Sequence, residues 1–198
     1  MPRTAIAVLP NDQRARLGGW LFLGSLVVFF VTSIGFYGIY AWSRRDDPFR
    51  QAPLPQSFLV STACLVAISA MVHGASRSVR RDRWIRTACL LGLSTVTAIV
   101  FLSVQVFAMQ RLLSETVGAA GNGRGVVGMV IVLAFLHALH VAGGVIWLGM
   151  VTVRTGLGRY DHERHFAVDF AAHYWHFLDI VWIIMLAVFW ATTGGFGL

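Results

Sequence analysis

The sequence predicts an all-α membrane protein, folded as a bundle of five transmembrane helices. Of its 198 residues 57% are hydrophobic and only 13% are charged, too few charges to cover the surface of a water-soluble domain of this length. The apolar residues also gather in five runs, each close to or longer than the roughly 20 residues that a helix needs to cross a bilayer. The predicted spans are about 17–41, 57–76, 88–113, 126–153 and 170–192.

The first span is expected to be retained in the protein. Residues 1–16 are polar and basic, but the apolar run that follows is longer than the roughly 7 to 15 residues of a signal-peptide core. The later spans are separated by connections rich in charged residues, glycine or proline, as is typical of segments outside lipid. None of these connections is long enough to fold separately. Residues 1–198 are therefore expected to form a single transmembrane domain.

The arginines predict how the chain is oriented in the membrane. The net charge of +7 includes sixteen arginines and no lysine, and eleven of the arginines precede the first span or lie in the second and fourth connections. Because positively charged loops stay in the cytoplasm, this distribution predicts a cytoplasmic N-terminus and an external C-terminus in the inner membrane. No basic and aromatic face of the kind that binds nucleic acid is present, so nucleic acid is not an expected partner.

Ionisable side chains inside the spans are the first candidates for function, because an unpaired one costs several kcal/mol in a bilayer. His137 and His140 share a face of the fourth span, and His176 and Asp179 lie three residues apart on the fifth. At about 1.5 Å per residue, His140 and Asp179 reach similar depths. We therefore predict a buried hydrogen bond between them. The full set of predicted structural interhelix polar residues is His137, His140, His176, Asp179 and Gln105.

Three other interpretations of these residues remain open. His137 and His176 could ligate a haem, although their estimated depths differ. The histidines and Asp179 also carry the donors of a metal site, but the surrounding aromatic residues leave little room for an open coordination position. A proton relay would need a continuous wet path, and the first two spans offer almost no ionisable group. We favour structural pairing, with no catalytic residue and no cofactor or metal bound by this chain.

The residues around these histidines resemble subunit III of the haem-copper respiratory oxidases. Residues 137–144, reading HALHVAGG, resemble the family signature HGLHVxxG, and residues 174–182, reading YWHFLDIVW, are similar to the more specific signature YWHFVDxVW. The chain looks like the short, five-helix form of this family. Weaker similarity extends over nearly the whole chain, at residues 17–25, 52–55 and 101–105 and at His73, Arg154, His165 and Asp169.

The resemblance implies a non-catalytic subunit of a cytochrome c or quinol oxidase. Such a subunit packs beside the catalytic subunit I, which holds the haem and copper, and near subunit II. Members of the family are thought to sustain proton uptake, to protect the catalytic centre and to hold phospholipid between their helices. Arg154 matches an arginine of the family and is a candidate contact for a lipid phosphate.

Two positions depart from the family pattern. Leu26 and Ala108 stand where the family carries glutamates, which weakens a carboxylate-dependent proton relay and leaves a role in scaffolding and lipid binding. The nearest alternative is the accessory protein of nitric oxide reductase that shares this fold. A free-standing ion transporter is an alternative of a different class.

Overall fold

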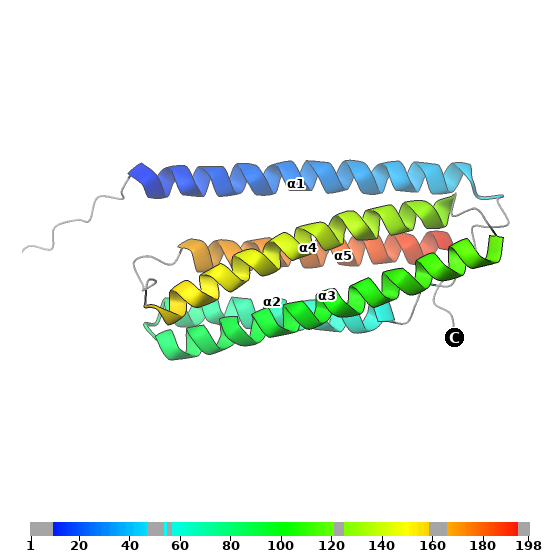
Figure 1. Ribbon diagram of the computed structural model, residues 1–198. Helices are drawn as coiled ribbons and strands as arrows, with labels where there is room; N and C mark the ends of the chain where they lie inside the picture. Colours follow the sequence, from blue (N-terminus) through cyan, green and yellow to red (C-terminus); the bar gives the residue numbers. More distant parts are fainter. Residues whose placement is uncertain (1–9, 47–53, 55–56, 121–124, 159–165, 194–198) are drawn as a thin grey trace, which may run out of the picture.

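The computed structural model describes residues 10–46, 54, 57–120, 125–158 and 166–193, and it confirms the all-α fold with five long apolar helices (Figure 1). By length and composition, each of the five can cross a membrane. The helices are α1 (Pro10–Ser43), α2 (Ser57–Val79), α3 (Trp84–Ala120), α4 (Val126–Gly156) and α5 (Phe166–Thr193).

Every helix contains its predicted span and continues beyond it at one or both ends. α1 begins at Pro10 instead of residue 17, and α3 continues to Ala120 instead of residue 113. Hydropathy detects the part of a helix that lies in hydrocarbon, whereas a helix persists as long as its backbone hydrogen bonds do. The helix ends therefore reach past the apolar layer.

Helices α2 to α5 pack in chain order, and α5 returns to contact α2. α1 lies on the outside of this four-helix group, against α4 and α5 (Figure 1). Consecutive helices run in opposite directions, which gathers one end of each of the five helices on one side of the bundle (Figure 1). We call this side the hairpin end, and it contains the start of α1, the α2–α3 turn, the end of α4 and the start of α5.

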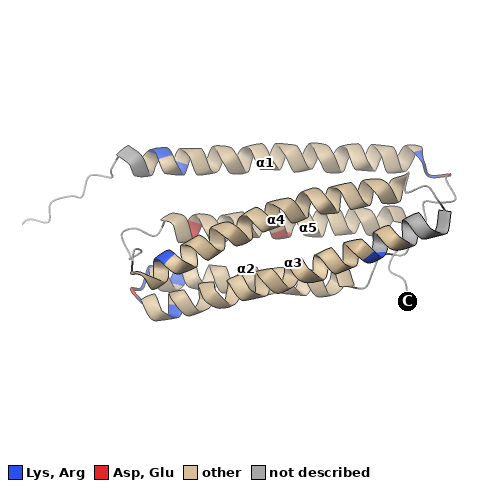
Figure 2. Ribbon diagram, viewed as in Figure 1, with Lys and Arg blue, Asp and Glu red and all other residues tan. Residues whose placement is uncertain are grey.

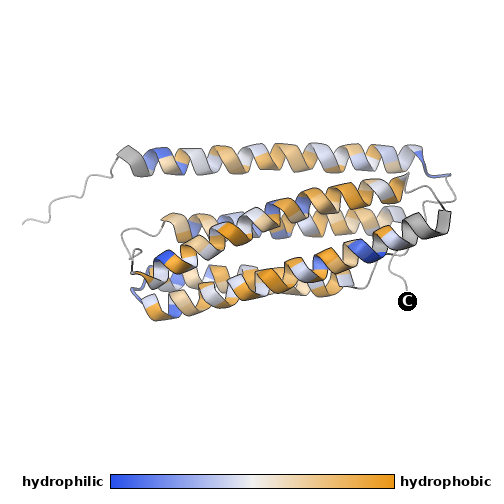
Figure 3. Cartoon of the chain, in the orientation of Figure 1, coloured by the Kyte–Doolittle hydropathy of each residue, from blue (hydrophilic) through white to orange (hydrophobic). Residues whose placement is uncertain are grey.

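Hydrophobic residues are frequent along the middle of the helices (Figure 3), and many of them are exposed. Large apolar side chains such as Ile39, Phe107 and Ile146 face outward from α1, α3 and α4. Charged residues gather instead near the two ends, except for Asp179 midway along α5 (Figure 2). Eight of the eleven described arginines lie at the hairpin end, namely Arg14, Arg16, Arg77, Arg80, Arg81, Arg83, Arg86 and Arg154.

Aromatic side chains hold α1 against the rest of the bundle. Phe30 is buried and meets Phe177 of α5 with ring centroids 6.0 Å apart. Further along α1, the Tyr37 hydroxyl lies 2.5 Å from Thr192 Oγ1 of α5. The Tyr37 ring also meets Phe189 of α5 edge to face. α1 is thus joined to α5 at more than one depth.

Candidate functional site

His137 is completely buried and is surrounded by aromatic rings. Its imidazole stacks on Trp182 of α5 with centroids 5.3 Å apart and planes inclined by 27°, while Phe30 of α1 lies 6.0 Å away. Neither ring nitrogen has a hydrogen-bond partner among the described residues. Gln105 of α3 is also fully buried, with both amide atoms unpartnered in the same part of the chain.

His140 makes its hydrogen bond within its own helix. Its Nδ1 donates to the Leu136 carbonyl over 2.7 Å, and the ring lies against Phe29 and Phe30 of α1, at centroid distances of 5.7 and 5.0 Å. The imidazole therefore sits on the side of α4 that faces α1.

The structure does not form the predicted hydrogen bond between His140 and Asp179. Asp179 is buried, and its Oδ1 has no partner among the described residues. It lies three residues from His176, which bonds through Nδ1 to the hydroxyl of Ser69 on α2. His140 is therefore turned towards α1, and the similar depth estimated for the two residues does not bring it into a hydrogen bond with Asp179.

The side chains of residues 174–182 on α5 pack against three other helices of the bundle. The Tyr174 hydroxyl donates to the His140 carbonyl of α4 over 2.8 Å, and Trp182 Nε1 donates to Thr62 Oγ1 of α2 over 2.9 Å. Phe177 meets α1 at Phe30, and Trp175 is fully buried between these contacts. One short segment of α5 thus contacts three other helices, which explains why so many of its side chains are large or polar.

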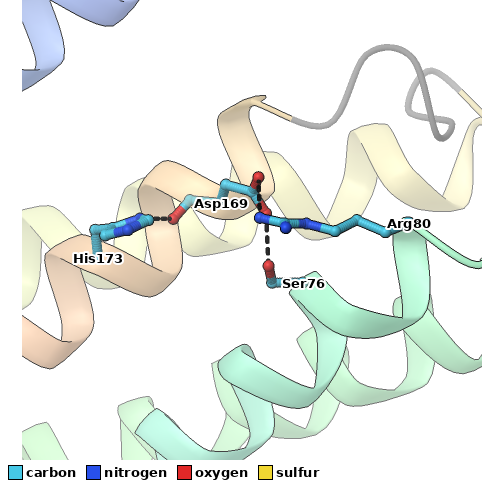
Figure 4. A network of polar contacts seen from close by, with 4 residues as sticks. All are labelled: Ser76, Arg80, Asp169 and His173. Atoms are coloured by element: carbon cyan, nitrogen blue, oxygen red, sulfur yellow. Dashed lines mark hydrogen bonds and ion pairs between the residues drawn. The ribbon is translucent and has the colours of Figure 1, made fainter.

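A polar network joins α2 and α5 at the hairpin end (Figure 4). The Asp169 carboxylate receives a hydrogen bond from Ser76 over 2.5 Å and forms an ion pair with Arg80 at 2.8 Å. The backbone carbonyl of Asp169 accepts a bond from His173 Nδ1 over 2.7 Å. Asp169 lies in the first turn of α5, where the helix dipole also favours a negative charge.

The sequence interpretation missed this network. Its signal was an acidic residue at the start of the fifth span, on the same side of the membrane as the arginine-rich second connection. Which arginine would reach it depends on the rotation of α2, which the sequence does not specify.

Replacing Asp169 with asparagine should lower the free energy of unfolding by about 1 kcal/mol, because a partly buried ion pair and its charge-assisted hydrogen bond are lost. Asp46→Asn is the matched control, since the Asp46 side chain is 95% exposed and its pair with Arg45 spans 3.8 Å. Unfolding by sodium dodecyl sulfate, followed by circular dichroism in mild detergent, measures both variants. Equal losses would contradict the role given to Asp169.

The two positions at which the sequence motifs predicted glutamates are both interior. Leu26 of α1 is 7% exposed and Ala108 of α3 is 1% exposed, and both belong to the apolar core. These two places are packed with hydrocarbon and carry no ionisable group.

Arg154 is exposed near the C-terminal end of α4. An apolar groove of about 460 Å³ opens at the same end, between α1, α4 and α5. Trp147 lines it from α4, seven residues before Arg154, so the two side chains share a helix face about 10 Å apart. The other lining residues are Ala15, Gly19, Phe22, Gly143, Phe166, Phe170 and Tyr174.

The predicted polar residues do not converge on a metal-binding arrangement. In the part of the chain that the structure describes, no group of three or more histidine, cysteine, aspartate or glutamate side chains is placed to hold an ion. Cys64 and Cys89 are free thiols, on α2 and α3.

Together the fold and the site define a polytopic membrane protein whose last helix is bound to the rest by a histidine-rich and tryptophan-rich motif. Residues 48–193 match the family model for cytochrome c oxidase subunit III. The chain belongs to this family, and it is a subunit III of a haem-copper oxidase.

Individual relatives extend the match to the N-terminal part of the chain. Cytochrome c oxidase subunit 3 of Bacillus subtilis is 26% identical, with 94% of this chain and 90% of the relative aligned. The corresponding subunit of Pylaiella littoralis is 31% identical over 92% of this chain and 68% of its own length. Subunit 3 of the cytochrome bo(3) ubiquinol oxidase of Pseudomonas putida is 23% identical over 90% and 86%.

Proposed function

We propose that this chain is a non-catalytic structural subunit that packs beside subunit I and subunit II of a terminal oxidase in aerobic respiration and stabilises the catalytic subunit. The observation that supports this proposal most directly is that the side chains of residues 174–182 on α5 contact other helices of the same chain. Tyr174, Phe177 and Trp182 contact α4, α1 and α2 of the same chain, so these side chains build the bundle and line no reaction centre. In this proposal subunit I holds the haem and copper, and this chain binds neither.

The interior of the chain favours scaffolding over proton transfer. Leu26 and Ala108 place hydrocarbon in the core where family members carry carboxylates. The carboxylate of Asp169 is held by Ser76 and Arg80 at the hairpin end. A relay through this chain would need protonatable groups at short intervals across the whole bilayer. α5 carries such groups at Asp169, His173, His176 and Asp179, but residues 180–193 of the same helix carry none.

The experiment is to compare the purified oxidase with and without this subunit. The depleted complex should retain its initial rate of oxygen consumption per haem, because the reaction centre lies elsewhere, but it should lose activity faster during continuous turnover. A depleted complex with intact haem and no initial activity would contradict a non-catalytic role.

We also propose that the hairpin end faces the cytoplasm, with the C-terminus outside. The supporting observation is the arginine distribution, since loops that carry arginine are retained inside during insertion. A reporter enzyme that folds only outside the cytoplasm, fused after Leu198, should be active. Inactivity of that fusion, with activity of the same reporter at the N-terminus, would reverse the assignment.

The groove beside α1 is proposed to hold a phospholipid acyl chain, with its phosphate at Arg154. The lining is largely aromatic, and Arg154 lies on the Trp147 face of α4, nearer the end of the bundle. Native mass spectrometry should show that Arg154→Gln retains less phospholipid than the control Arg111→Gln, in which the arginine lies near the opposite end. Equal retention by the two variants would remove Arg154 from the site.

A further inference from the structure

The α2–α3 turn encloses a recess lined by four arginines. Arg77 and Arg81 reach it from α2 and the turn, and Arg83 and Arg86 from the turn and α3. The recess has a volume of about 350 Å³, and its lining also includes His73 but no carboxylate. We refer to the space between these four arginines as the arginine recess.

The shape of the recess follows from the spacing of residues on α2. Ala70, Gly74 and Ser78 recur every four residues and form a small-residue floor. His73 and Arg77 lie one residue before Gly74 and Ser78 on α2, and Arg81 follows in the turn, so basic side chains line the recess beside the small ones. The short side chains at Ala70, Gly74 and Ser78 occupy little volume, which leaves space between the longer arginine side chains.

The turn that presents these arginines is fixed by backbone hydrogen bonds. Arg83 N–H donates to the Ser78 carbonyl and Asp82 N–H to the Val79 carbonyl, each over 3.2 Å, while Asp82 has a positive φ of 53°. These are the two bonds of a Schellman motif, which ends one helix in a defined geometry. α3 then starts at once, with Thr87 N–H bonded to the Arg83 carbonyl over 3.0 Å. The positions of the arginine Cα atoms are therefore set before any ligand arrives.

The arginines of the recess outnumber the acidic side chains of the turn, which among the described residues has Asp82 alone, between Arg81 and Arg83. Arg80, the first residue after α2, is neutralised by Asp169. Arg77, Arg81, Arg83 and Arg86 line one hollow and form no ion pair with another described residue. Like charges held this close repel one another and raise the local positive potential, which a bound anion relieves.

We propose that the arginine recess is a binding site for a phosphate group. Guanidinium groups bind phosphate oxygens through paired N–H bonds. A phosphate group also offers more oxygens to several arginines than the two of a carboxylate. The exposed Trp84 beside the recess is typical of the membrane–water interface, where acidic phospholipids present such a group. This inference does not depend on the role of the chain in an oxidase.

The test is a titration of the full chain in mild detergent with phosphatidylglycerol, followed by native mass spectrometry, and a second titration with inorganic phosphate as competitor. Each arginine near an anionic headgroup contributes about 1 kcal/mol, so Arg81→Gln with Arg86→Gln should weaken phosphatidylglycerol binding about 30-fold. The control pair Arg14→Gln with Arg111→Gln removes the same charge outside the recess and should change the affinity little. Arg81→Lys with Arg86→Lys should retain more affinity than the glutamine pair, because it keeps the charge.

The outcomes separate the two sources of phosphate. Binding that inorganic phosphate does not displace assigns the recess to a lipid headgroup, and binding that it displaces at similar concentrations assigns it to a soluble phosphate-bearing anion. If the recess pair and the control pair weaken binding equally, the effect is one of overall charge and the proposal is wrong. Circular dichroism of each variant confirms that the helices remain folded.

Discussion

Replacing Trp182 with alanine should lower the free energy of unfolding of the chain by about 3 to 5 kcal/mol. The indole is completely buried, donates to Thr62 of α2, stacks on His137 of α4 and meets Phe58 edge to face at 5.4 Å. Alanine removes all three contacts and leaves a cavity where α2, α4 and α5 meet. In a bilayer such packing carries more of the association energy of helices than hydrophobic burial does.

The control for this variant is Trp190→Ala on the same helix. Trp190 is 57% exposed, so its loss removes surface that faces outward and should cost less than about 1 kcal/mol. Titration with sodium dodecyl sulfate, monitored by circular dichroism, measures both. If the two alanine variants unfold at the same detergent ratio, Trp182 is not a centre of packing.

Gly144→Ala should push α4 away from α5 and lower the free energy of unfolding by about 1 to 3 kcal/mol. A Cβ atom at Gly144 would lie 2.9 Å from Tyr174 Cε1, and the Tyr174 ring cannot easily move because its hydroxyl is bonded to the His140 carbonyl. Relief of the clash would therefore strain or break that interhelix bond.

The neighbouring glycine provides a matched control for this prediction. A Cβ atom at Gly143 would meet nothing within 4 Å, and alanine is the better helix former, so Gly143→Ala should be neutral or slightly stabilising. The same unfolding titration distinguishes the variants. A loss at Gly143 equal to that at Gly144 would show that general helix effects, and not contact with Tyr174, control stability here.

The positions of the five helices were predictable because crossing lipid demands a continuous apolar segment. Each predicted span lies inside a helix of the structure, and the motif around Tyr174 and Trp182 identified the family that the comparisons show. The helix ends were less predictable, as α1 and α3 show, because hydropathy does not report where backbone hydrogen bonding stops.

The partners of the buried polar residues were not predictable from their depth. The rise per residue gives similar depths for His140 and Asp179, but contact also depends on how each helix is rotated about its axis. Hydropathy sets that rotation poorly here, because α4 and α5 carry apolar side chains on all sides, facing both interior and exterior. In the structure the aromatic residues of α1 cover His140. His176, three residues before Asp179 on α5, bonds to Ser69 of α2.

The most direct test of the central claim is to purify this chain by a tag from gently solubilised membranes and to examine what accompanies it. The account predicts a complex with a haem spectrum that consumes oxygen when supplied with reduced cytochrome c or quinol. An unrelated tagged membrane protein from the same membranes should bring down no haem. Recovery of this chain without a haem-containing subunit, or in a complex that reduces nitric oxide but not oxygen, would contradict its assignment as a structural subunit of a terminal oxidase.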